Sequence, residues 1–465
     1  MTHSRNYRTL RRLILPALAG GALAALAFAP TFGAEPVQAN VPSQSISVPK
    51  GDAPKADVPK TDVPKADVPR PDDVKTGEIN EQTPHKEANP STFTGTSVIS
   101  ESKTFEHQRF DNTTSDQNAF ISKNKATITI DSSVFDKTGN TTNDDNSNFR
   151  GQNAVVLGIE GSQTNIKDSN ITSNSIGSNA VFATGEGSVI NVENTNIHTK
   201  GDSSRGLDAT YKGTVNGKNL TITTEGAHSA TLATDRGEGT ITAEAAKLTT
   251  SGTGSPVIYS TGNITANNVN GVANKSEIGV VEGKNSITLT NSNVTGYHDN
   301  GFMLYQSFSG DAESGIARLK AENNTLTTHG TGAFIYVNNT TAEADLTGNT
   351  ILMPNTTTLV KAAADSRWGK DGENGGHLTL RASNQELNGN IVADSISTVS
   401  LDMTNGSSLV GAVNTNNTAK EITMKLSKDS TWTLTGDSYV KSLTNEDTTN
   451  SNIHLNGYKL VVADK

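Results

Sequence analysis

The feature that most constrains the fold is an internal repeat with a period of about 25 residues. The repeat becomes visible when segments are aligned on a short apolar opening strand. The segments are NAVVLGIEGSQTNIKDSNITSNSIGS from Asn153, NAVFATGEGSVINVENTNIHTKGDSSR from Asn179, GLDATYKGTVNGKNLTITTEGAHS from Gly206 and ATLATDRGEGTITAEAAKLTTSGTGS from Ala230. A period of this length is typical of a solenoid, in which each repeat stacks on its neighbours.

Each repeat contains three short strand candidates separated by Gly, Asn or Asp. In the second repeat these are residues 180–182, 189–192 and 196–198. Alternation within a strand, as at Ile128 and Ile130, directs one set of side chains inward and the other to solvent. No ten-residue stretch after Ser91 shows a helical period. We therefore predict an all-β fold, a single-stranded parallel β-helix (solenoid) that is nearly free of helix.

The size of the solenoid follows from the period. At roughly 24 residues per turn and about 4.8 Å between stacked strands, residues 95–465 would form about 15 turns and a rod on the order of 70 Å long. The turns beginning near Gly301 and Thr357 are longer, and they carry the segments 307–317 and 364–376. Insertions leave a solenoid as loops, where binding residues concentrate.

Composition supports a thin solenoid. Aromatic residues make up 5% of the chain and hydrophobic residues 33%, which is too lean for a globule of 465 residues. The chain has no cysteine, which excludes disulfides, thiolate metal sites and a cysteine nucleophile. The absence of cysteine also suits a protein that stays unfolded while it crosses an oxidising periplasm.

The N-terminus has the order of a secretory signal peptide. Four arginines within the first 12 residues precede an uncharged apolar run from Leu13 to Ala29. This run is too short for a transmembrane helix and is interrupted by Pro16. Val37 and Ala39 fit the small-residue rule for cleavage, so we predict a signal peptide over residues 1–39 and export of the chain.

A proline-rich segment follows. The stretch KGDAPKADVPKTDVPKADVPR places proline at every fifth position and charges between the prolines. Such a sequence favours extended polyproline II and cannot form a core, so we predict a disordered linker over residues 40–92. The β-helix would occupy residues 93–465.

The predicted β-helix is acidic. Residues 91–465 contain 27 Lys and Arg against 38 Asp and Glu, whereas the first 90 residues are nearly balanced. Nucleic-acid partners favour a basic face, so the charge excludes this class of ligand.

The C-terminal region carries motifs of a known family. Gly389-Asn390-Ile391, the run Asn405 to Gly411 (NGSSLVG) and the strand pair from Trp432 to Leu443 (WTLTGDSYVKSL) resemble the distal passenger region of pertactin-like autotransporters. The resemblance is close over about 75 residues. The remainder resembles the family only in its general pattern of short strands and polar turns. It implies a right-handed β-helical passenger that is displayed at the outer membrane or released, commonly as an adhesin or aggregation factor.

The resemblance also has consequences for location. Passengers of this family are followed by a β-barrel translocator, and no such barrel follows the motifs in this chain. We therefore expect location at the cell surface, the outer membrane or the extracellular space if a separate translocator acts, and in the periplasm if none does.

The sequence offers few groups for catalysis. The candidate pairs of adjacent ionisable residues are Asp144-Asp145 and His298-Asp299. No second group of acidic or basic residues lies one repeat away from either pair, where stacking would bring the two groups together. Ser438 follows Gly436-Asp437 but precedes Tyr439, so the protease motif G-D-S-G is incomplete. The nine histidines lack paired spacing. We predict no catalytic residue, cofactor or metal site.

Three aromatic residues are predicted ligand contacts. Tyr297 and Tyr305 belong to a cluster that holds a dense share of the aromatic residues, although Tyr305 could instead fill the interior with Phe302 and Leu304. Trp368 lies in a polar loop with no apolar periodicity to bury it. The expected partner is a host or bacterial surface glycan or protein, with self-association as a further mode.

Four residues are predicted to form the distal core, namely Trp432, Leu434, Val440 and Leu443. Trp432 alternates with Leu434, so both should point inward, and Ser438, Val440 and Leu443 should begin the turn above them.

The predicted function is that of a non-enzymatic adhesin or aggregation passenger. A polysaccharide-processing enzyme on a pectin-lyase-like scaffold and an inert remnant of a truncated autotransporter remain as alternatives.

Overall fold

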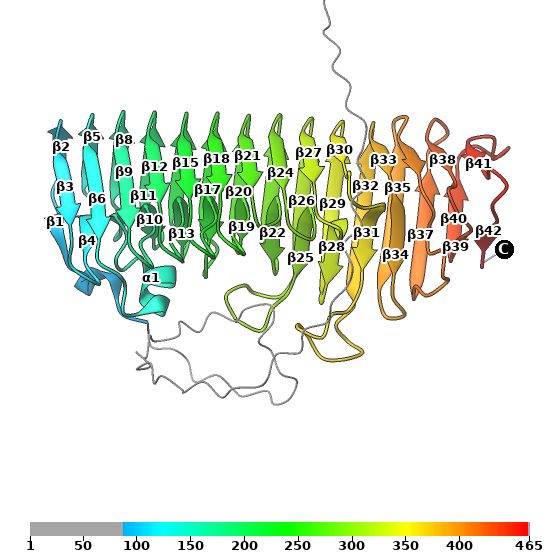
Figure 1. Ribbon diagram of the computed structural model, residues 1–465, viewed down its shortest axis with the longest axis horizontal. Coiled ribbons are helices and arrows are strands. Elements are labelled where there is room, and N and C mark those ends of the chain that lie inside the picture. The colour runs from blue at the N-terminus through cyan, green and yellow to red at the C-terminus, as the bar shows by residue number, and fades with distance from the viewer. Residues whose placement is uncertain (1–86, 464–465) are drawn as a thin grey trace, which may run out of the picture. The chain divides into compact units, whose positions relative to one another are not determined.

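The computed structural model describes residues 87–463, which contain a parallel β-solenoid of about 15 turns spanning residues 95–462 (Figure 1). This confirms the predicted all-β solenoid. The predicted signal peptide and residues 40–86 of the predicted linker lie outside the described residues. No helix within residues 87–463 is long and apolar enough to cross a membrane.

The strands form three long parallel sheets, in which each strand pairs with the equivalent strand of the next turn. Sheet A contains β1 (Gly95–Ile99), β4 (Asn118–Ser122), β7 (Val156–Gly158), β10 (Val181–Thr184), β13 (Leu207–Thr210), β16 (Leu232–Thr234), β19 (Ile258–Ser260), β22 (Gly279–Glu282), β25 (Phe302–Tyr305), β28 (Ala333–Asn338), β31 (Thr358–Ala362) and β34 (Asn390–Ala393). Sheet B contains β2 (Lys103–Glu106), β5 (Thr127–Asp131), β8 (Gln163–Lys167), β11 (Val189–Glu193), β14 (Thr214–Lys218), β17 (Thr240–Glu244), β20 (Asn263–Asn267), β23 (Ser286–Thr290), β26 (Ile316–Glu322), β29 (Thr340–Thr347), β32 (Gly376–Ser383), β35 (Thr398–Thr404), β37 (Glu421–Leu426) and β40 (Ser442–Asn445).

Sheet C ends before the other two long sheets. It contains β3 (Arg109–Asn112), β6 (Val134–Thr138), β9 (Asn170–Asn174), β12 (Asn196–Thr199), β15 (Thr221–Thr224), β18 (Lys247–Thr250), β21 (Asn270–Ala273), β24 (Asn293–Gly296), β27 (Thr325–Thr328) and β30 (Thr350–Leu352). The last turns add sheet D, with β33 (Glu386–Asn388), β36 (Ser408–Val410), β38 (Thr431–Thr433) and β41 (Ile453–His454), and a terminal pair of β39 (Ser438–Val440) and β42 (Leu460–Val462).

The core consists of inward side chains that stack on the equivalent residues of neighbouring turns. In sheet B one such row passes through buried aliphatic residues in register, interrupted by Thr164: Ile128, Thr164, Ile190, Val215, Ile241, Ile264, Ile287, Leu319, Ala344, Leu380, Leu401 and Met424. Because a β-branched or aliphatic residue at every turn fills this row, a chain with few aromatic residues can still bury a continuous core.

The corner between sheets B and C explains the abundance of asparagine. Each turn there places one residue in the left-handed region, where asparagine is tolerated better than most residues. The residues are His107, Ser132, Asp168, Asn194, Asn219, Ala245, Asn268, Asn291, Asn323 and Gly348, with φ between 48° and 60°. Asn384 and Asn405 occupy the equivalent position between sheets B and D, with φ of 47° and 54°. Side-chain amides also connect successive turns, since Asn219 donates to Asn194 at 2.7 Å and Asn194 donates to Asp168 at 3.0 Å.

One helix was not predicted. The helix α1 (Asp144–Arg150) interrupts the passage from sheet C to sheet A. Asn143 caps its N-terminus by accepting a hydrogen bond from the backbone of Asn146, and Gly151 ends it in the left-handed conformation. Its seven residues are too few to show a helical period. The acidic pair Asp144-Asp145 lies in its first turn.

Residues 87–92, which the sequence places in the linker, contact the solenoid. The short 3₁₀ helix η1 (Pro90–Thr92) precedes β1, and the backbone N–H of Ala88 donates to the side chain of Asn146 in α1 at 2.9 Å. Phe93 is buried against Ile121, Leu157 and Phe182.

The predicted distal-core residues lie in the last two turns. Trp432 and Leu434 are fully buried, Val440 is buried and Leu443 is partly buried against the core. The expectation that Ser438, Val440 and Leu443 lie over Trp432 was wrong. Ile453 of β41 pairs with Trp432 in the next turn, whereas Val440 and Leu443 belong to other sides of the solenoid, in β39 and β40. From Trp432 the chain passes through β39 and β40 before β41 returns to the same side of the solenoid.

Candidate functional site

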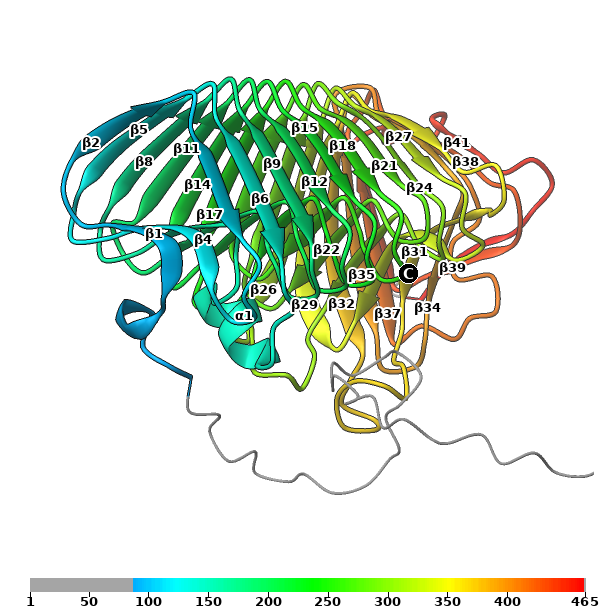
Figure 2. The same ribbon diagram turned by 60° about the vertical axis from the view of Figure 1, so that its left-hand side comes forward.

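Three insertions project on the side of the solenoid that carries sheet A. They are α1, the loop 306–315 between β25 and β26, and the loop 363–375 between β31 and β32. Figures 1 and 2 show α1 and both loops on one side of the stacked strands. Both long loops occur where the sequence predicts them. They give the otherwise smooth solenoid its most irregular surface.

The predicted contact residues separate into two places. Tyr305 and Trp368 lie together, with ring centroids 5.5 Å apart, and the ring of Phe308 lies 6.4 Å from Trp368. Tyr305 is buried, Trp368 is half-buried and Phe308 is exposed. Tyr297 lies in the turn before β25, where it stacks on His329 with centroids 4.5 Å apart. Tyr297 is half-exposed, so it remains available for contact with a ligand. Tyr305 is buried, so its role is structural.

Beneath the loop 306–315 lies a cluster of charged residues that the sequence analysis missed. We call it the sheet A cluster, and its members are Arg205, Asp208, Asp235, Arg236, Glu282 and Asp311. These residues are separated by up to 106 positions, but the solenoid brings them together because β13, β16 and β22 are stacked in sheet A. The recurrence of acidic residues near the ends of these strands is the signal that could have revealed the cluster.

Glu282 ties the loop 306–315 to sheet A. Its carboxylate accepts hydrogen bonds from the hydroxyls of Tyr259 at 2.9 Å, Tyr305 at 3.0 Å and Ser309 at 3.3 Å, and also from Ser307. Burial raises the pKa of Glu282, and the hydrogen bonds from Ser307 and Tyr259 counteract this increase. The loop therefore depends on a carboxylate that is almost inaccessible to solvent.

Asp208 and Asp235 share one cation. The Nε of Arg205 lies 3.0 Å from Asp235 and 3.9 Å from Asp208, and Arg205 also donates to Asn148 of α1 at 2.7 Å. Neither carboxylate oxygen of Asp208 has a hydrogen-bond partner. Burial and the neighbouring charge of Asp235 raise the pKa of Asp208 well above its usual range. Burial also raises the pKa of Asp235 to about 6, although Arg205 opposes the shift. The pair therefore binds protons more readily than free carboxyls do.

We expect the stability of the protein to depend on this pair. Asp235 has a pKa of about 6 when folded against an ordinary value of 3.8, so between these values the folded state binds a proton that the unfolded state does not. The free energy of unfolding from this group should consequently rise by up to about 3 kcal/mol as the pH falls from 7 to 4. Urea unfolding at pH 5.0 and 7.5 measures the change, and Asp235→Asn should flatten it. Equal pH dependence in the variant and the wild type would contradict the assignment.

The sheet A cluster differs from an open active site. Three or more carboxylates and bases converge, which is the arrangement that a polysaccharide-processing enzyme requires. However, Asp208, Asp235 and Glu282 are buried. The loop 306–315 contacts Glu282 through Ser307, and α1 contacts Arg205 through Asn148. The adjacent basic and acidic residues noted in the sequence, His298 and Asp299, are exposed, and the Nδ1 of His298 lies 3.6 Å from the carboxylate of Asp299.

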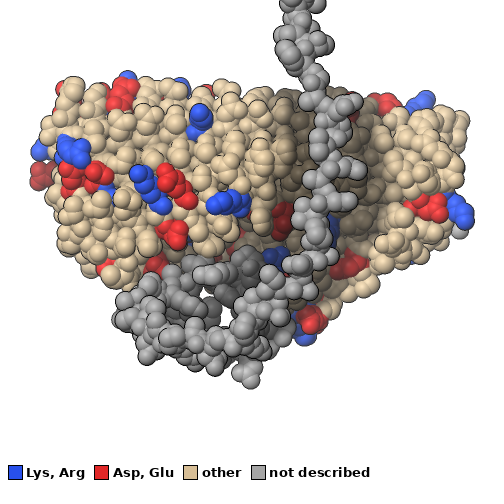
Figure 3. Space-filling view, viewed as in Figure 1, with Lys and Arg blue, Asp and Glu red and all other residues tan. Residues whose placement is uncertain are grey.

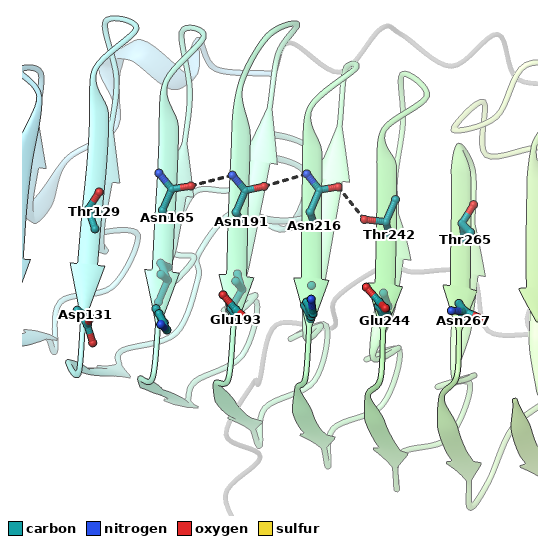
Figure 4. Close-up of a pocket in the computed structure, with 16 residues that line it drawn as sticks. Thr129, Asp131, Asn165, Asn191, Glu193, Asn216, Thr242, Glu244, Thr265 and Asn267 are labelled. Atoms are coloured by element: carbon teal, nitrogen blue, oxygen red, sulfur yellow. Dashed lines mark hydrogen bonds between the residues drawn. The ribbon is translucent and has the colours of Figure 1, made fainter. Parts of the chain in front are cut away.

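A second candidate surface is the outer face of sheet B. A shallow groove of about 550 Å³ extends across β5, β8, β11, β14, β17 and β20. Figure 4 shows a ladder along its floor, in which Asn191 donates to Asn165 at 2.8 Å, Asn216 donates to Asn191 at 2.9 Å and Thr242 donates to Asn216 at 2.7 Å. An amide nitrogen has two donor hydrogens, and the bonds from Asn191 and Asn216 each use one of them, whereas Thr242 donates its hydroxyl. The ladder therefore presents regularly spaced polar groups to solvent.

A row of charges borders the ladder. Asp131, Lys167, Glu193, Lys218 and Glu244 are in register on successive strands, so neighbouring turns carry opposite charges. The row is close to neutral overall. Figure 3 likewise shows charges of both signs scattered over the visible face, with most of the surface occupied by uncharged residues. The visible face therefore has no patch of a single sign that would match a strongly charged ligand.

Within residues 87–463, no group of three or more His, Asp or Glu side chains has a geometry that could hold a metal ion. Neither the protein-family models nor the curated proteins provide a match to this sequence.

Proposed function

We propose that the chain is an exported, non-enzymatic adhesin that binds extended ligands along the outer face of sheet B. The observation that carries the proposal is the ladder of Asn165, Asn191, Asn216 and Thr242, which repeats one polar group per turn. A repeating surface suits a repeating partner, since many weak contacts add along its length. The partner class that fits best is a surface glycan, whose hydroxyls pair with amides and hydroxyls.

Other features of the chain support this proposal. The signal peptide directs the chain out of the cytoplasm, and the resemblance of residues 387–462 to autotransporter passengers favours display at the cell surface or release. Self-association along the same face is the alternative mode, because the charge row of one copy could pair with that of another in a shifted register.

A substitution series tests the proposal. Asn165→Ala, Asn191→Ala and Asn216→Ala, combined in the exported chain, should weaken binding to immobilised cell-surface glycans by at least about tenfold. The reason is that three hydrogen bonds, each of about 0.5 to 1.5 kcal/mol, are lost together. The matched control is His198→Ala, Thr223→Ala and Thr249→Ala, which changes the outer face of sheet C at three successive turns. Glycan binding that responds equally to both sets, or to neither, would refute the proposed surface. Sedimentation of the same variants separates self-association from glycan binding.

The buried cluster favours a second candidate function. The convergence of Asp208, Asp235 and Glu282 would suit a polysaccharide-processing enzyme if the loop 306–315 opened. Release of reducing ends from a polysaccharide by the wild type, with loss of that activity in Asp235→Asn, would favour the enzyme over the adhesin.

A further inference from the structure

A carboxylate-binding cradle lies beside the sheet A cluster, and the chain itself fills it. Glu87 accepts hydrogen bonds from the Nε of Arg150 at 2.6 Å, from the hydroxyl of Tyr211 at 2.5 Å and from Arg236. Only 8% of its side chain is exposed. Although burial alone would raise the pKa of Glu87, the hydrogen bonds from Tyr211 and Arg236 hold it below its usual value. The carboxylate is thus bound in its charged form.

The cradle is assembled from distant parts of the chain. Arg150 and Phe149 come from the last turn of α1, Tyr211 comes from the turn after β13 and Arg236 comes from the turn after β16. Arg236 and Tyr211 adopt φ angles of 23° and 46°. Left-handed backbone at non-glycine residues costs free energy, and it places both residues at the turns that follow β13 and β16.

Both arginines are held in place without Glu87. The guanidinium of Arg150 lies 3.7 Å from the ring centroid of Tyr211, and that of Arg236 lies 3.7 Å from the ring centroid of Phe149. Arg236 also pairs with Asp311 of the loop 306–315 at 2.5 Å. Because aromatic stacking fixes the two planar donors, the cradle is preorganised to receive a carboxylate.

The segment that occupies the cradle makes few other contacts. Beyond Glu87, the backbone N–H of Ala88 donates to Asn146, the side chain of Ala88 packs against the apolar cluster around Phe93, and Phe93 is the next buried anchor. The contact through a backbone N–H fits a peptide ligand, because in a peptide the N–H of the next residue follows the residue that carries the carboxylate. Glu87 therefore shows how an acidic peptide binds here.

We propose that Arg150, Tyr211 and Arg236 form a binding site for acidic peptide segments, which Glu87 occupies in cis and which opens when the N-terminal segment is displaced. Ligands of this class are extended chains that carry a glutamate or aspartate followed by a free backbone N–H. The site is independent of sheet B, so its failure would leave the proposed glycan-binding function untouched.

Peptide titration of the exported chain tests the site. The probe is the fluorescently labelled peptide HKEANPSTFT, compared with the same peptide carrying glutamine in place of glutamate. The receptor is Glu87→Gln combined with Phe93→Ala, which frees the segment from its own site. This receptor should bind the glutamate peptide at least about tenfold more tightly than the wild type does and at least about tenfold more tightly than it binds the glutamine peptide.

Further variants distinguish a site from a simple tether. Adding Arg236→Gln to the receptor should abolish the preference for glutamate, whereas adding Arg381→Gln, which removes an exposed arginine of sheet B paired with Asp345, should preserve it. Circular dichroism and thermal unfolding show whether each variant is folded, and Glu87→Gln alone replaces the receptor if Phe93→Ala prevents folding. Equal binding of both peptides, no binding by a folded receptor, or tighter binding of oligogalacturonate than of the peptide would overturn the proposal.

Discussion

Gly226→Ala should destabilise the solenoid by about 3 kcal/mol or more, a large effect for the addition of one methyl group. Gly201, Gly226 and Gly252 occupy equivalent positions after β12, β15 and β18, where three turns approach closely. A Cβ atom at Gly226 would lie 1.9 Å from the carbonyl oxygen of Gly201, and one at Gly252 would lie 1.7 Å from that of Gly226. Both obstacles are backbone atoms, so relief requires the separation of paired strands in sheet C.

Urea unfolding measures the loss, and hydrogen exchange locates it. Protection should fall first in β12, β15 and β18, because stability in a solenoid depends on neighbouring turns. The matched control is Gly372→Ala in the loop 363–375, where no atom lies within 4 Å of the added carbon. Its φ of 82° makes alanine strained, so a cost of about 1 kcal/mol is expected. A smaller effect at Gly226 than at Gly372 would show that the turns can separate at little cost.

The repeat predicted the solenoid because stacking makes each turn resemble its neighbours. The Thr-x-Gly pattern at Thr199, Thr224 and Thr250 illustrates this point. Each threonine hydroxyl donates at 2.5 Å to the carbonyl of a serine five residues later, and each following glycine permits the close approach of the preceding turn. The same local requirement recurs in these three consecutive turns, so it is visible as a period in the sequence. The two long loops could be predicted because they interrupt that period.

The sheet A cluster and the cradle could not be predicted in this way. Arg205 and Asp235 are 30 positions apart, and Glu87 lies 149 positions from Arg236. Their meeting depends on the insertion of α1, whose seven residues have no periodic signal, and on loops that bend back over sheet A. The aromatic cluster around Tyr305 was visible in composition, and burial of Tyr305 with Phe302 and Leu304 was one of the two interpretations, but the buried partner of its hydroxyl, Glu282, could not be predicted.

Trp432→Ala should cost about 3 to 5 kcal/mol and unravel the C-terminal end of the solenoid first. Trp432 is fully buried, and it is flanked in register by Leu409 and Ile453. Its indole Nε1 donates to the carbonyl oxygen of Gly411 at 3.0 Å. The substitution therefore leaves a large cavity and removes the partner of a buried carbonyl. Only one further turn lies beyond β38 to restrain the end.

The second tryptophan of the chain provides the control. Trp368 is half-buried in the loop 363–375, and its indole N–H has no hydrogen-bond partner. Trp368→Ala should therefore change the free energy of unfolding by less than about 1 kcal/mol. Hydrogen exchange decides between a local and a global effect. Trp432→Ala should accelerate exchange across residues 413–462 and leave residues 95–300 protected, because each turn is stabilised by its immediate neighbours. Unchanged protection of residues 413–462 would show that Trp432 does not hold the distal turns together, since the cavity would then be absorbed without loss of strand pairing.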